Sequence, residues 1–240
     1  MSNVFDQDSL DNLASAIDLA TVALVRRLPR IAQEPSFTEQ LLSEIRRVVN
    51  GYTLDFKPRT GPRFSFGSRP NPVVLTADQF DGRTLADRGL GSEENDIGAD
   101  MLLFLDTPNV EGLSPKKGLL AQAKMQRSNF QYTSDGQLFD QCSDMYKVTN
   151  SSYAIIYATN GVFVFDNPLA QNIGTLRRKD VTWSVGSLVS HFIDCTIGDR
   201  QITEIEVGPF RDVARSLRSK RYEEAALAQG LQSLVISAEE

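Results

Sequence analysis

The sequence has little of two residue types that often carry chemistry: one histidine, His191, and two cysteines, Cys142 and Cys195, among 240 residues. A single histidine leaves too little material for a histidine-based catalytic triad or zinc site. The cysteines lie far apart without metal-ligand spacing, so we expect small buried apolar residues rather than a disulfide framework. Any chemistry must therefore come from carboxylates, Lys, Gln, Tyr or Ser.

Long hydrophobic runs are also lacking. The most apolar candidate for a membrane span, residues 10–31, contains charged residues that include Asp11, Asp18, Arg26 and Arg27. The N-terminus is acidic rather than basic, which argues against a signal peptide. Together with the scarcity of cysteine, these absences predict a soluble cytoplasmic protein without a membrane partner.

Positive charge is in deficit: 25 Lys and Arg oppose 31 Asp and Glu, and the net charge is −6. A protein that coats nucleic acid non-specifically would need the opposite balance. A local basic groove is compatible with this total, because the distribution of charge matters more than its sum. Apolar residues, 41% of the chain, are grouped into periodic segments, which predicts a sizeable core.

Apolar residues at helical spacing predict helices at 9–28, 36–50, 135–149, 186–195 and 210–229. Ser36 and Glu39 have the spacing of a capping box at the start of the second helix. Apolar runs and alternation predict strands at 52–57, 72–77, 97–106, 118–125, 152–158, 162–165 and 181–185. The stretch 78–95 is predicted to be a loop, and Asn160-Gly161 a tight hairpin turn. We expect the strands 97–106 and 118–125 to pair in antiparallel fashion.

Two triplets within apolar runs are the most informative feature of the chain: Gly98-Ala99-Asp100 and Gln122-Ala123-Lys124. Burying a charge is costly, so a carboxylate and a lysine on neighbouring buried strands require a reason. Because side chains alternate along a strand, Gln122 and Lys124 share one face, and the hairpin can place Asp100 beside them. A simple buried ion pair between Asp100 and Lys124 is the alternative, although such pairs rarely stabilise a fold.

This arrangement suits the hydrolysis of a phosphodiester bond. Asp100 can bind a hard divalent ion, and the side chain of Gln122 and the backbone carbonyl of Ala123 can add oxygen ligands. Mg²⁺ is the expected ion, with Mn²⁺ as a substitute. Lys124 can orient or help to deprotonate the attacking water and can offset the charge of the phosphate.

On these two triplets the sequence resembles the PD-(D/E)XK nuclease superfamily, and in particular its Mrr-type members, in which a Gly-x-Asp strand precedes a Gln-x-Lys strand. The resemblance covers residues 36–165 and implies a restriction-endonuclease-like α/β fold. It also implies a metal-holding glutamate on the preceding helix, for which Glu39 is the candidate. A glutamine near the metal or substrate is implied on the following helix, and Gln141 is the candidate. Helix capping and a solvated helix surface are the respective alternatives.

Gln122 departs from the superfamily pattern, which more often has Asp or Glu at this position. A neutral ligand weakens the binding of Mg²⁺, and a further carboxylate would compensate. Glu39 and Glu94, which lies in the acidic stretch before Asp100, are the predicted additional carboxylates. Plain loop charge is the alternative for Glu94.

Contacts with nucleic acid are predicted in two places. A loop rich in Pro and Gly interleaves Arg59, Arg63 and Arg69 with phenylalanines, a pattern typical of segments that meet a nucleic-acid backbone. Arg127 and Tyr132, which follow the second site strand, are the other candidates. A plain surface loop and ordinary packing of the aromatic ring are the alternatives.

The sequence therefore predicts an α/β protein with a mixed central sheet flanked by helices. It divides into an N-terminal helical extension (1–35), a nuclease-like core (36–165) and a C-terminal extension packed on that core (166–240). We expect a Mg²⁺-dependent nuclease that cuts DNA, and the resemblance implies restriction or antiviral defence. A homodimer or a partner protein that delivers the substrate is compatible with this function. The alternatives are a degenerate nuclease fold that serves as a non-catalytic nucleic-acid-binding or regulatory subunit, and a resolvase acting on branched DNA.

Overall fold

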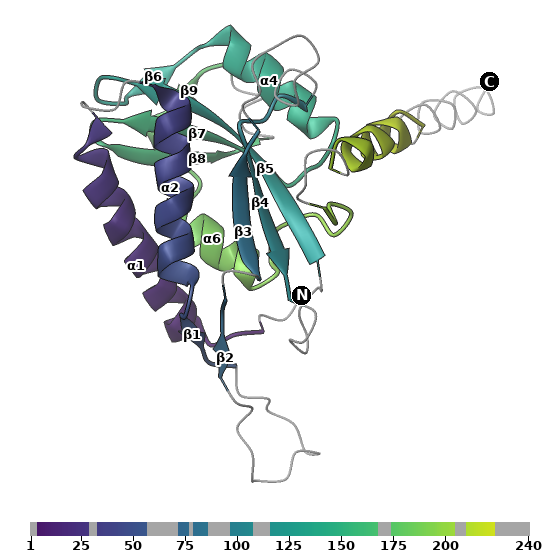
Figure 1. Cartoon of the computed structure of the whole chain (residues 1–240). Helices are drawn as coiled ribbons and strands as arrows, with labels where there is room; N and C mark the ends of the chain where they lie inside the picture. The colour runs from purple at the N-terminus through teal and green to yellow at the C-terminus, as the bar shows by residue number, and fades with distance from the viewer. Residues whose placement is uncertain are drawn as a thin grey trace, which may run out of the picture.

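The structure, a computed structural model, describes residues 4–28, 33–56, 72–76, 79–85, 97–107, 116–167, 174–204 and 210–223. Within these ranges the chain forms an α/β fold on a mixed five-stranded sheet, as predicted (Figure 1). The predictions for Arg59, Arg63, Arg69 and Glu94 lie outside the described residues.

The central sheet has the strand order β3-β4-β5-β7-β8. Its strands are β3 (Phe80–Thr84), β4 (Met101–Asp106), β5 (Lys116–Gln126), β7 (Ser152–Ala158) and β8 (Gly161–Asp166). Neighbours are antiparallel except β5 and β7, which are parallel and are connected through helix α4 (Gly136–Tyr146). The predicted antiparallel pairing of the two site strands is confirmed, as is the tight hairpin between β7 and β8. Its turn residues are Thr159 and Asn160, one position earlier than predicted, because Gly161 already pairs with Ala158.

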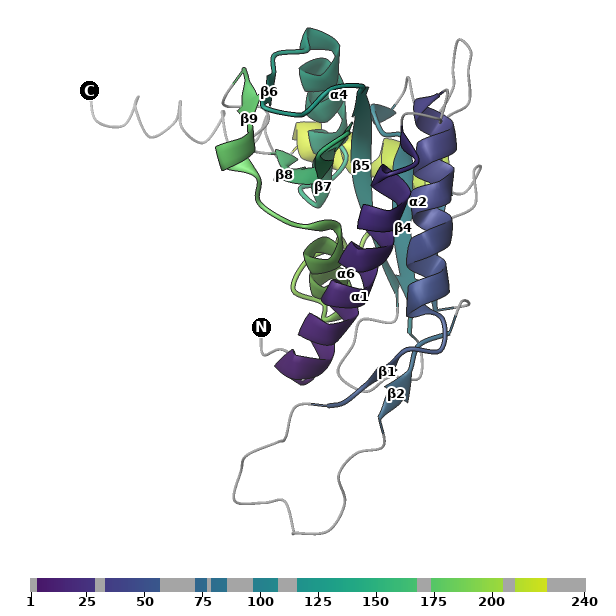
Figure 2. The ribbon, with the colours of Figure 1, turned by 90° about the vertical axis from the view of Figure 1, so that its left-hand side faces the viewer.

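Helices cover both faces of this sheet. One face carries α1 (Gln7–Val25), α2 (Glu34–Val49) and α6 (Val185–Ile193), and the other carries α4 and the helix at 210–223. On β4, Met101 and Leu103 pack toward α1 and α2, whereas Leu102 packs toward α4. Alternate residues of one strand therefore enter two separate cores, as expected for a sheet buried on both faces. Figure 2 is seen from the side of α1, with the helix at 210–223 behind the sheet.

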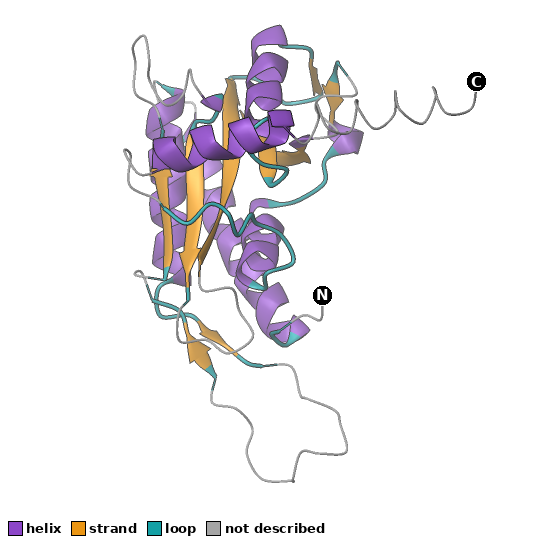
Figure 3. Cartoon of the chain, turned by 90° about the vertical axis from the view of Figure 1, so that its right-hand side faces the viewer, coloured by secondary structure: helices purple, strands orange, loops and turns teal. Residues whose placement is uncertain are grey.

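The predicted helices at 135–149 and 186–195 are confirmed as α4 and α6. The helix predicted at 210–229 is helical over its described part, 210–223, and Figure 3 shows it lying across the strands. Its Phe210 and Leu217 are buried in the core on the α4 side of the sheet. No helix in the described ranges is long and apolar enough to cross a membrane.

The start of α2 differs from the prediction. The helix begins at Glu34, and Gln33 precedes it without a side-chain cap, so the predicted capping box at Ser36 is wrong. Pro35 explains the earlier start, since proline in the first turn has a fixed φ that suits the helix and needs no N–H partner there. The shift moves Glu34 into the position from which it reaches the site.

The edge strand β3 replaces a predicted loop. Residues 80–84 pair with β4, and Gly82 lies where a Cβ atom would stand 2.8 Å from the side chain of Leu103 and 2.9 Å from that of Leu42. The glycine, typical of a turn in sequence, serves here to let α2 and β4 approach the edge strand. The loop prediction for 78–95 was therefore wrong over 80–84, and 86–96 lie outside the described residues.

Three short pairings complete the fold. The predicted strands 52–57 and 72–77 shrink to β1 (Thr53–Leu54) and β2 (Val73–Val74), which pair with each other outside the central sheet. β6 (Tyr132–Thr133) pairs with β9 (Leu176–Arg177), a contact that the sequence did not predict. The strand predicted at 181–185 is wrong: Trp183 makes a single bridge to Val164, and α6 begins at Val185.

Candidate functional site

Asp100 lies immediately before β4, where that strand begins beside β5. Its backbone N–H donates to the carbonyl of Ala121 (3.0 Å). Its carboxylate oxygen Oδ2 accepts hydrogen bonds from the backbone N–H of Ala123 (2.8 Å) and from Nε2 of Gln122 (2.6 Å). Asp100 is only 8% exposed, so these donors hold a buried carboxylate at the end of the β4–β5 ladder.

Gly98 sets the approach of this segment to α4. Its φ of +76° lies in the left-handed region that favours glycine. A Cβ atom at this position would stand 2.4 Å from the backbone carbonyl oxygen of Gln141 on α4. The Gly98-x-Asp100 pattern therefore positions the carboxylate by packing the preceding turn tightly against the helix that follows β5.

Gln122 on β5 is 3% exposed, and its amide group bridges two oxygen atoms. Nε2 donates both to Oδ2 of Asp100 (2.6 Å) and to the carbonyl oxygen of Ala123 (3.1 Å). Oε1 is buried and accepts no hydrogen bond from the described part of the chain. An unpaired buried acceptor costs about 1–3 kcal/mol, so a cation or a donor placed beside this oxygen would be stabilising.

Lys124 lies two residues further along β5 and is half-buried. Its Nζ forms an ion pair with Oδ2 of Asp135 (2.9 Å), the residue that caps the N-terminus of α4 through Leu138 N–H. The hydrogen bond from Lys124 is the main cause that lowers the pKa of Asp135. The lysine thus stands on the α4 side of the site and is oriented by Asp135, whereas the alternative reading of the sequence had paired it with Asp100.

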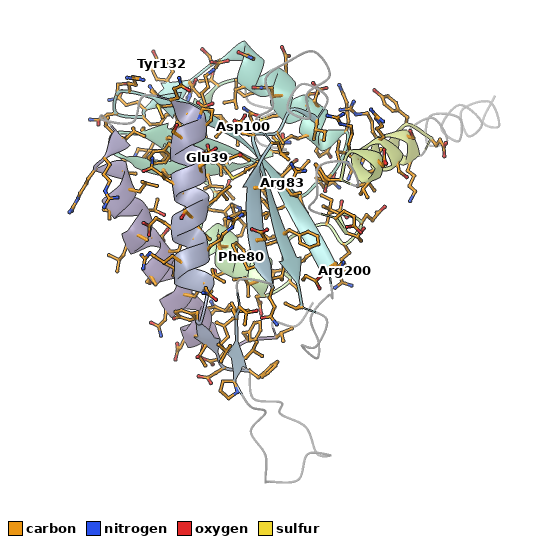
Figure 4. All side chains as sticks on the ribbon, in the orientation of Figure 1. Glu39, Phe80, Arg83, Asp100, Tyr132 and Arg200 are labelled. Atoms are coloured by element: carbon orange, nitrogen blue, oxygen red, sulfur yellow. The ribbon has the colours of Figure 1, made fainter. Side chains whose placement is uncertain are left out.

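A second carboxylate comes from Glu34 in the first turn of α2. It accepts a hydrogen bond from the backbone N–H of Met125 on β5, and together with Asp100 it lines a cavity of about 10 Å³. This volume is close to the minimum that holds one water molecule. Glu39, the predicted helix glutamate, lies exposed further along α2 (Figure 4). The signal for Glu34 was its place beside Pro35, since an acidic residue and a proline both favour the first helical turn.

Tyr157 on β7 lies near both Asp100 and Glu34. Its buried hydroxyl is hydrogen-bonded to Oγ1 of Thr38 on α2 (3.1 Å). Burial raises the pKa of Tyr157, and the negative charges of Asp100 and Glu34 raise it further. Asp100 and Glu34 therefore lie close enough to the Tyr157 hydroxyl for both of their negative charges to act on it.

Other predicted residues lie around this centre. Gln141 is half-buried on α4, with its backbone carbonyl against Gly98. Arg127 is exposed after β5, and Tyr132 on β6 is 63% exposed. A cleft of about 510 Å³ opens here, lined by Gln126, Asn129, Gln131, Tyr132, Thr133, Ser134 and Asp135. Asp135 thus belongs both to the cleft and to the ion pair with Lys124.

The oxygen atoms around Asp100 fit a small divalent cation. Asp100 and Glu34 contribute carboxylates, Ala123 a backbone carbonyl, and Gln122 the unpartnered Oε1, all hard donors of the kind that Mg²⁺ and Mn²⁺ prefer. Rotation of the Gln122 amide would turn Oε1 toward Asp100, an arrangement that a cation between the oxygens would stabilise. The described residues contain no group of three or more His, Cys, Asp or Glu that could hold a metal, so amide and carbonyl oxygens must complete the donor set.

Comparisons with protein-family models, with curated proteins and with solved structures give no match for this chain. The chemistry of the site is therefore inferred from its own residues and geometry.

Proposed function

We propose that this protein is a metal-dependent nuclease with a restriction-endonuclease-like core, and that its substrate is DNA. The observation that carries the proposal is the buried corner in which Asp100, Gln122 and the Ala123 carbonyl meet. Glu34 lies beside this corner, and Lys124 follows on the same strand. The order of α2, the β4–β5 hairpin and α4 along the chain agrees with the fold that the resemblance implies.

In this function each residue has a distinct task. Asp100, Glu34, Gln122 and the Ala123 carbonyl would hold Mg²⁺ or Mn²⁺. The chemistry that such an ion supplies is polarisation of the phosphate and activation of a water molecule. Lys124, held in place by Asp135, would neutralise charge that develops on the phosphate. Cleavage of foreign DNA is the biological role we propose, with a homodimer as the form that cuts two strands.

A second candidate is a degenerate nuclease fold that binds nucleic acid or regulates a partner without cutting. One observation favours it: the NH₂ group of Gln122 already occupies the space between the oxygens of Asp100 and Ala123. An amide in this place satisfies both oxygens without any metal. The two candidates therefore differ in whether a divalent ion displaces this amide.

A cleavage assay separates the two candidates. The protein is incubated with supercoiled plasmid, linear duplex, single-stranded DNA, RNA and four-way junctions, in Mg²⁺, in Mn²⁺ and in EDTA. We expect metal-dependent cleavage of DNA that falls about a hundredfold or more in Asp100→Asn and in Lys124→Met.

Two variants serve as matched controls for this assay. Asp106→Asn removes a carboxylate at the other end of β4, and Lys147→Met removes an exposed lysine of another ion pair. Both should cut at the wild-type rate. Absence of metal-dependent cleavage on every substrate, or equal cleavage by Asp100→Asn and Asp106→Asn, would eliminate the nuclease proposal in favour of the binding subunit. Cleavage confined to four-way junctions would indicate a resolvase.

A further inference from the structure

The polar cleft beside the Lys124–Asp135 ion pair contributes only Asp135 to the chemistry described above. We propose that it binds an unpaired nucleotide of a single-stranded nucleic acid, with the base stacked on Tyr132. Its volume of about 510 Å³ falls within the range of ligand pockets. The proposal deepens the nuclease function and rests on it for the course of the strand toward Asp100.

The lining of the cleft carries groups that can read the edge of a base. Gln126, Asn129 and Gln131 contribute carboxamides, each of which can donate and accept hydrogen bonds. Nε2 of Gln126 donates to Oγ of Ser128 (3.3 Å), whereas its Oε1 is buried and has no hydrogen-bond partner in the described ranges. Rotation of the Gln126 carboxamide would present this oxygen to an amino group of a base, and base edges present donors and acceptors side by side.

Tyr132 supplies the stacking surface. Its ring lines the cleft and is 63% exposed, in contrast to nearby Phe130, which is fully buried. Stacking of bases on exposed aromatic rings is the common basis of single-strand binding and tolerates any base. In a duplex the faces and pairing edges of the bases are already engaged, so only an unpaired nucleotide can use both the ring and the carboxamides.

The cleft is held in shape by contacts behind it. The backbone N–H of Phe130 donates to Oδ1 of Asn160 (2.8 Å), and Nδ2 of Asn160 donates back to the Phe130 carbonyl (3.3 Å). Asn129 accepts a hydrogen bond from Thr159 (2.9 Å), which fixes its amide. The β7–β8 turn therefore anchors the cleft segment, and little ordering remains to be done when a ligand binds.

Positive charge flanks the stacking ring. Arg177 pairs with Tyr132 in the β6–β9 ladder, and Arg178 and Lys179 follow, all three exposed. The backbone N–H of Arg178 donates to the carbonyl of Gln131 (3.0 Å), which ties this basic run to the cleft wall. The Arg178 guanidinium lies over the ring of Phe163, 5.8 Å from its centroid. These exposed basic side chains could neutralise the phosphates next to a bound nucleotide.

Strand β5 connects the cleft to the acidic corner, which is the buried corner where Asp100, Gln122 and the Ala123 carbonyl meet. Gln122, Lys124 and Gln126 share one face of β5, and the first and last lie about 13 Å apart at the usual rise of a strand. A nucleic-acid strand that crosses Lys124 would therefore meet Asp100 at one end and the cleft at the other.

Binding measured in EDTA tests the proposal without any cleavage. Fluorescence anisotropy is recorded with short labelled single-stranded DNA, single-stranded RNA of the same sequence, and duplex DNA. We expect single-stranded DNA and single-stranded RNA both to bind more tightly than duplex DNA. The tighter of the two single strands shows whether the cleft prefers deoxyribose or ribose. Tyr132→Ala should weaken single-strand binding about tenfold, whereas Tyr132→Phe, which keeps the ring, should bind like the wild type.

Tyr222→Ala is the matched control, because Tyr222 is 61% exposed but lies on the helix at 210–223. The combined substitution of Arg178→Gln and Lys179→Gln should weaken binding to every nucleic acid and reduce its dependence on salt. Equal affinity for single strands and duplex, or equal loss in Tyr132→Ala and Tyr222→Ala, would overturn the cleft proposal. If the protein prefers single strands but shows no metal-dependent cleavage, the nuclease proposal is wrong and the cleft proposal is supported.

Discussion

The side-chain amide of Gln122 stabilises the acidic corner in the absence of a metal. Its NH₂ group carries partial positive charge and contacts the two oxygens that a cation would otherwise join, those of Asp100 and Ala123. A carboxylate in its place would instead stand beside Asp100 as a second negative charge. A glutamine at this position therefore stabilises the metal-free protein, and a divalent ion would bind it more weakly than it would bind a carboxylate.

Gln122→Glu should lower the stability of the metal-free protein and increase its affinity for a divalent ion. In EDTA we expect the free energy of unfolding at neutral pH to fall by about 2 kcal/mol, because two buried carboxylates then face each other without a donor between them. Mn²⁺ should restore the loss, since an ion at a hundredfold its dissociation constant contributes about 2.7 kcal/mol. Thermal unfolding across a Mn²⁺ titration measures both effects.

Gln126→Glu is the control for this substitution, because Gln126 lies on the same face of β5 but lines the cleft. Its unfolding temperature should respond to Mn²⁺ no more than that of the wild type. If Gln122→Glu also showed no added response to Mn²⁺, the corner would not be a metal site.

At the scale of elements, the turn at Gly98 decides whether β4 and α4 can meet. Gly98→Ala combines a left-handed φ with a Cβ atom 2.4 Å from the Gln141 carbonyl, so we expect a loss of at least about 2 kcal/mol in the free energy of unfolding. Urea denaturation measures the loss. Cleavage activity should fall as well, because the turn also positions Asp100.

Two other glycines separate the effect of a left-handed φ from the effect of a close contact at the Cβ position. Gly51 has a φ of +82° but open space around its Cβ position, so Gly51→Ala should show the conformational cost alone, about 1 kcal/mol. Gly136, in the first turn of α4, has neither feature, and its replacement by alanine should be neutral or stabilising. A loss at Gly98 no larger than that at Gly51 would show that the close approach to α4 is unimportant.

Elements with a long, regular pattern could be predicted from the sequence, and short or tertiary features could not. Apolar periodicity predicts α1, α4 and α6, and the Asn160-Gly161 dipeptide signals the β7–β8 hairpin to within one residue. β3 could not be distinguished from a loop, because the close packing that requires Gly82 involves residues distant in sequence. The resemblance pointed to Glu39 as the helix glutamate, whereas the proline that fixes the helix start places Glu34 at the site.

The candidate site shows the same division. The pairing of the site strands brings Asp100 and Gln122 together as their register requires. The partner of Lys124 depends on where α4 begins, which sets the position of Asp135 and has no signal in the two triplets. Likewise the pairing of Tyr132 with Arg177 joins segments far apart in the chain.

At the scale of the whole molecule, a buried lysine links the sheet to α6 and the N-terminus. Nζ of Lys117 on β5 donates to the carbonyls of Phe192 and Ile197 (2.9 Å to the latter), and so binds the carbonyl end of α6. The neighbouring Asp194 carboxylate accepts hydrogen bonds from Val4 N–H (2.9 Å) and Phe5 N–H (3.1 Å). Both charges are buried, so the stability of the fold should depend on the proton of Lys117.

The direction of that dependence follows from the pKa. Burial lowers the pKa of Lys117 to about 8, from an ordinary value of 10.5. Below pH 8 the folded and unfolded chains both carry the proton; above it the folded chain releases the proton while the unfolded chain keeps it up to pH 10.5. Stability due to this group therefore rises with pH across that window and is lost as pH falls through about 8.

Lys117→Met removes this titration. The free energy of unfolding of the wild type minus that of Lys117→Met should increase from pH 7 to pH 10, by up to about 3 kcal/mol for the whole shift. Buried Tyr153, Tyr157 and Cys142 have raised pKa values and destabilise the fold at high pH, but they do so equally in both proteins and cancel in the difference. Urea denaturation at successive pH values gives the two curves. Parallel curves would mean that Lys117 keeps its proton in the folded chain at pH 10, and that the carbonyls of Phe192 and Ile197 stabilise the ammonium enough to offset its burial.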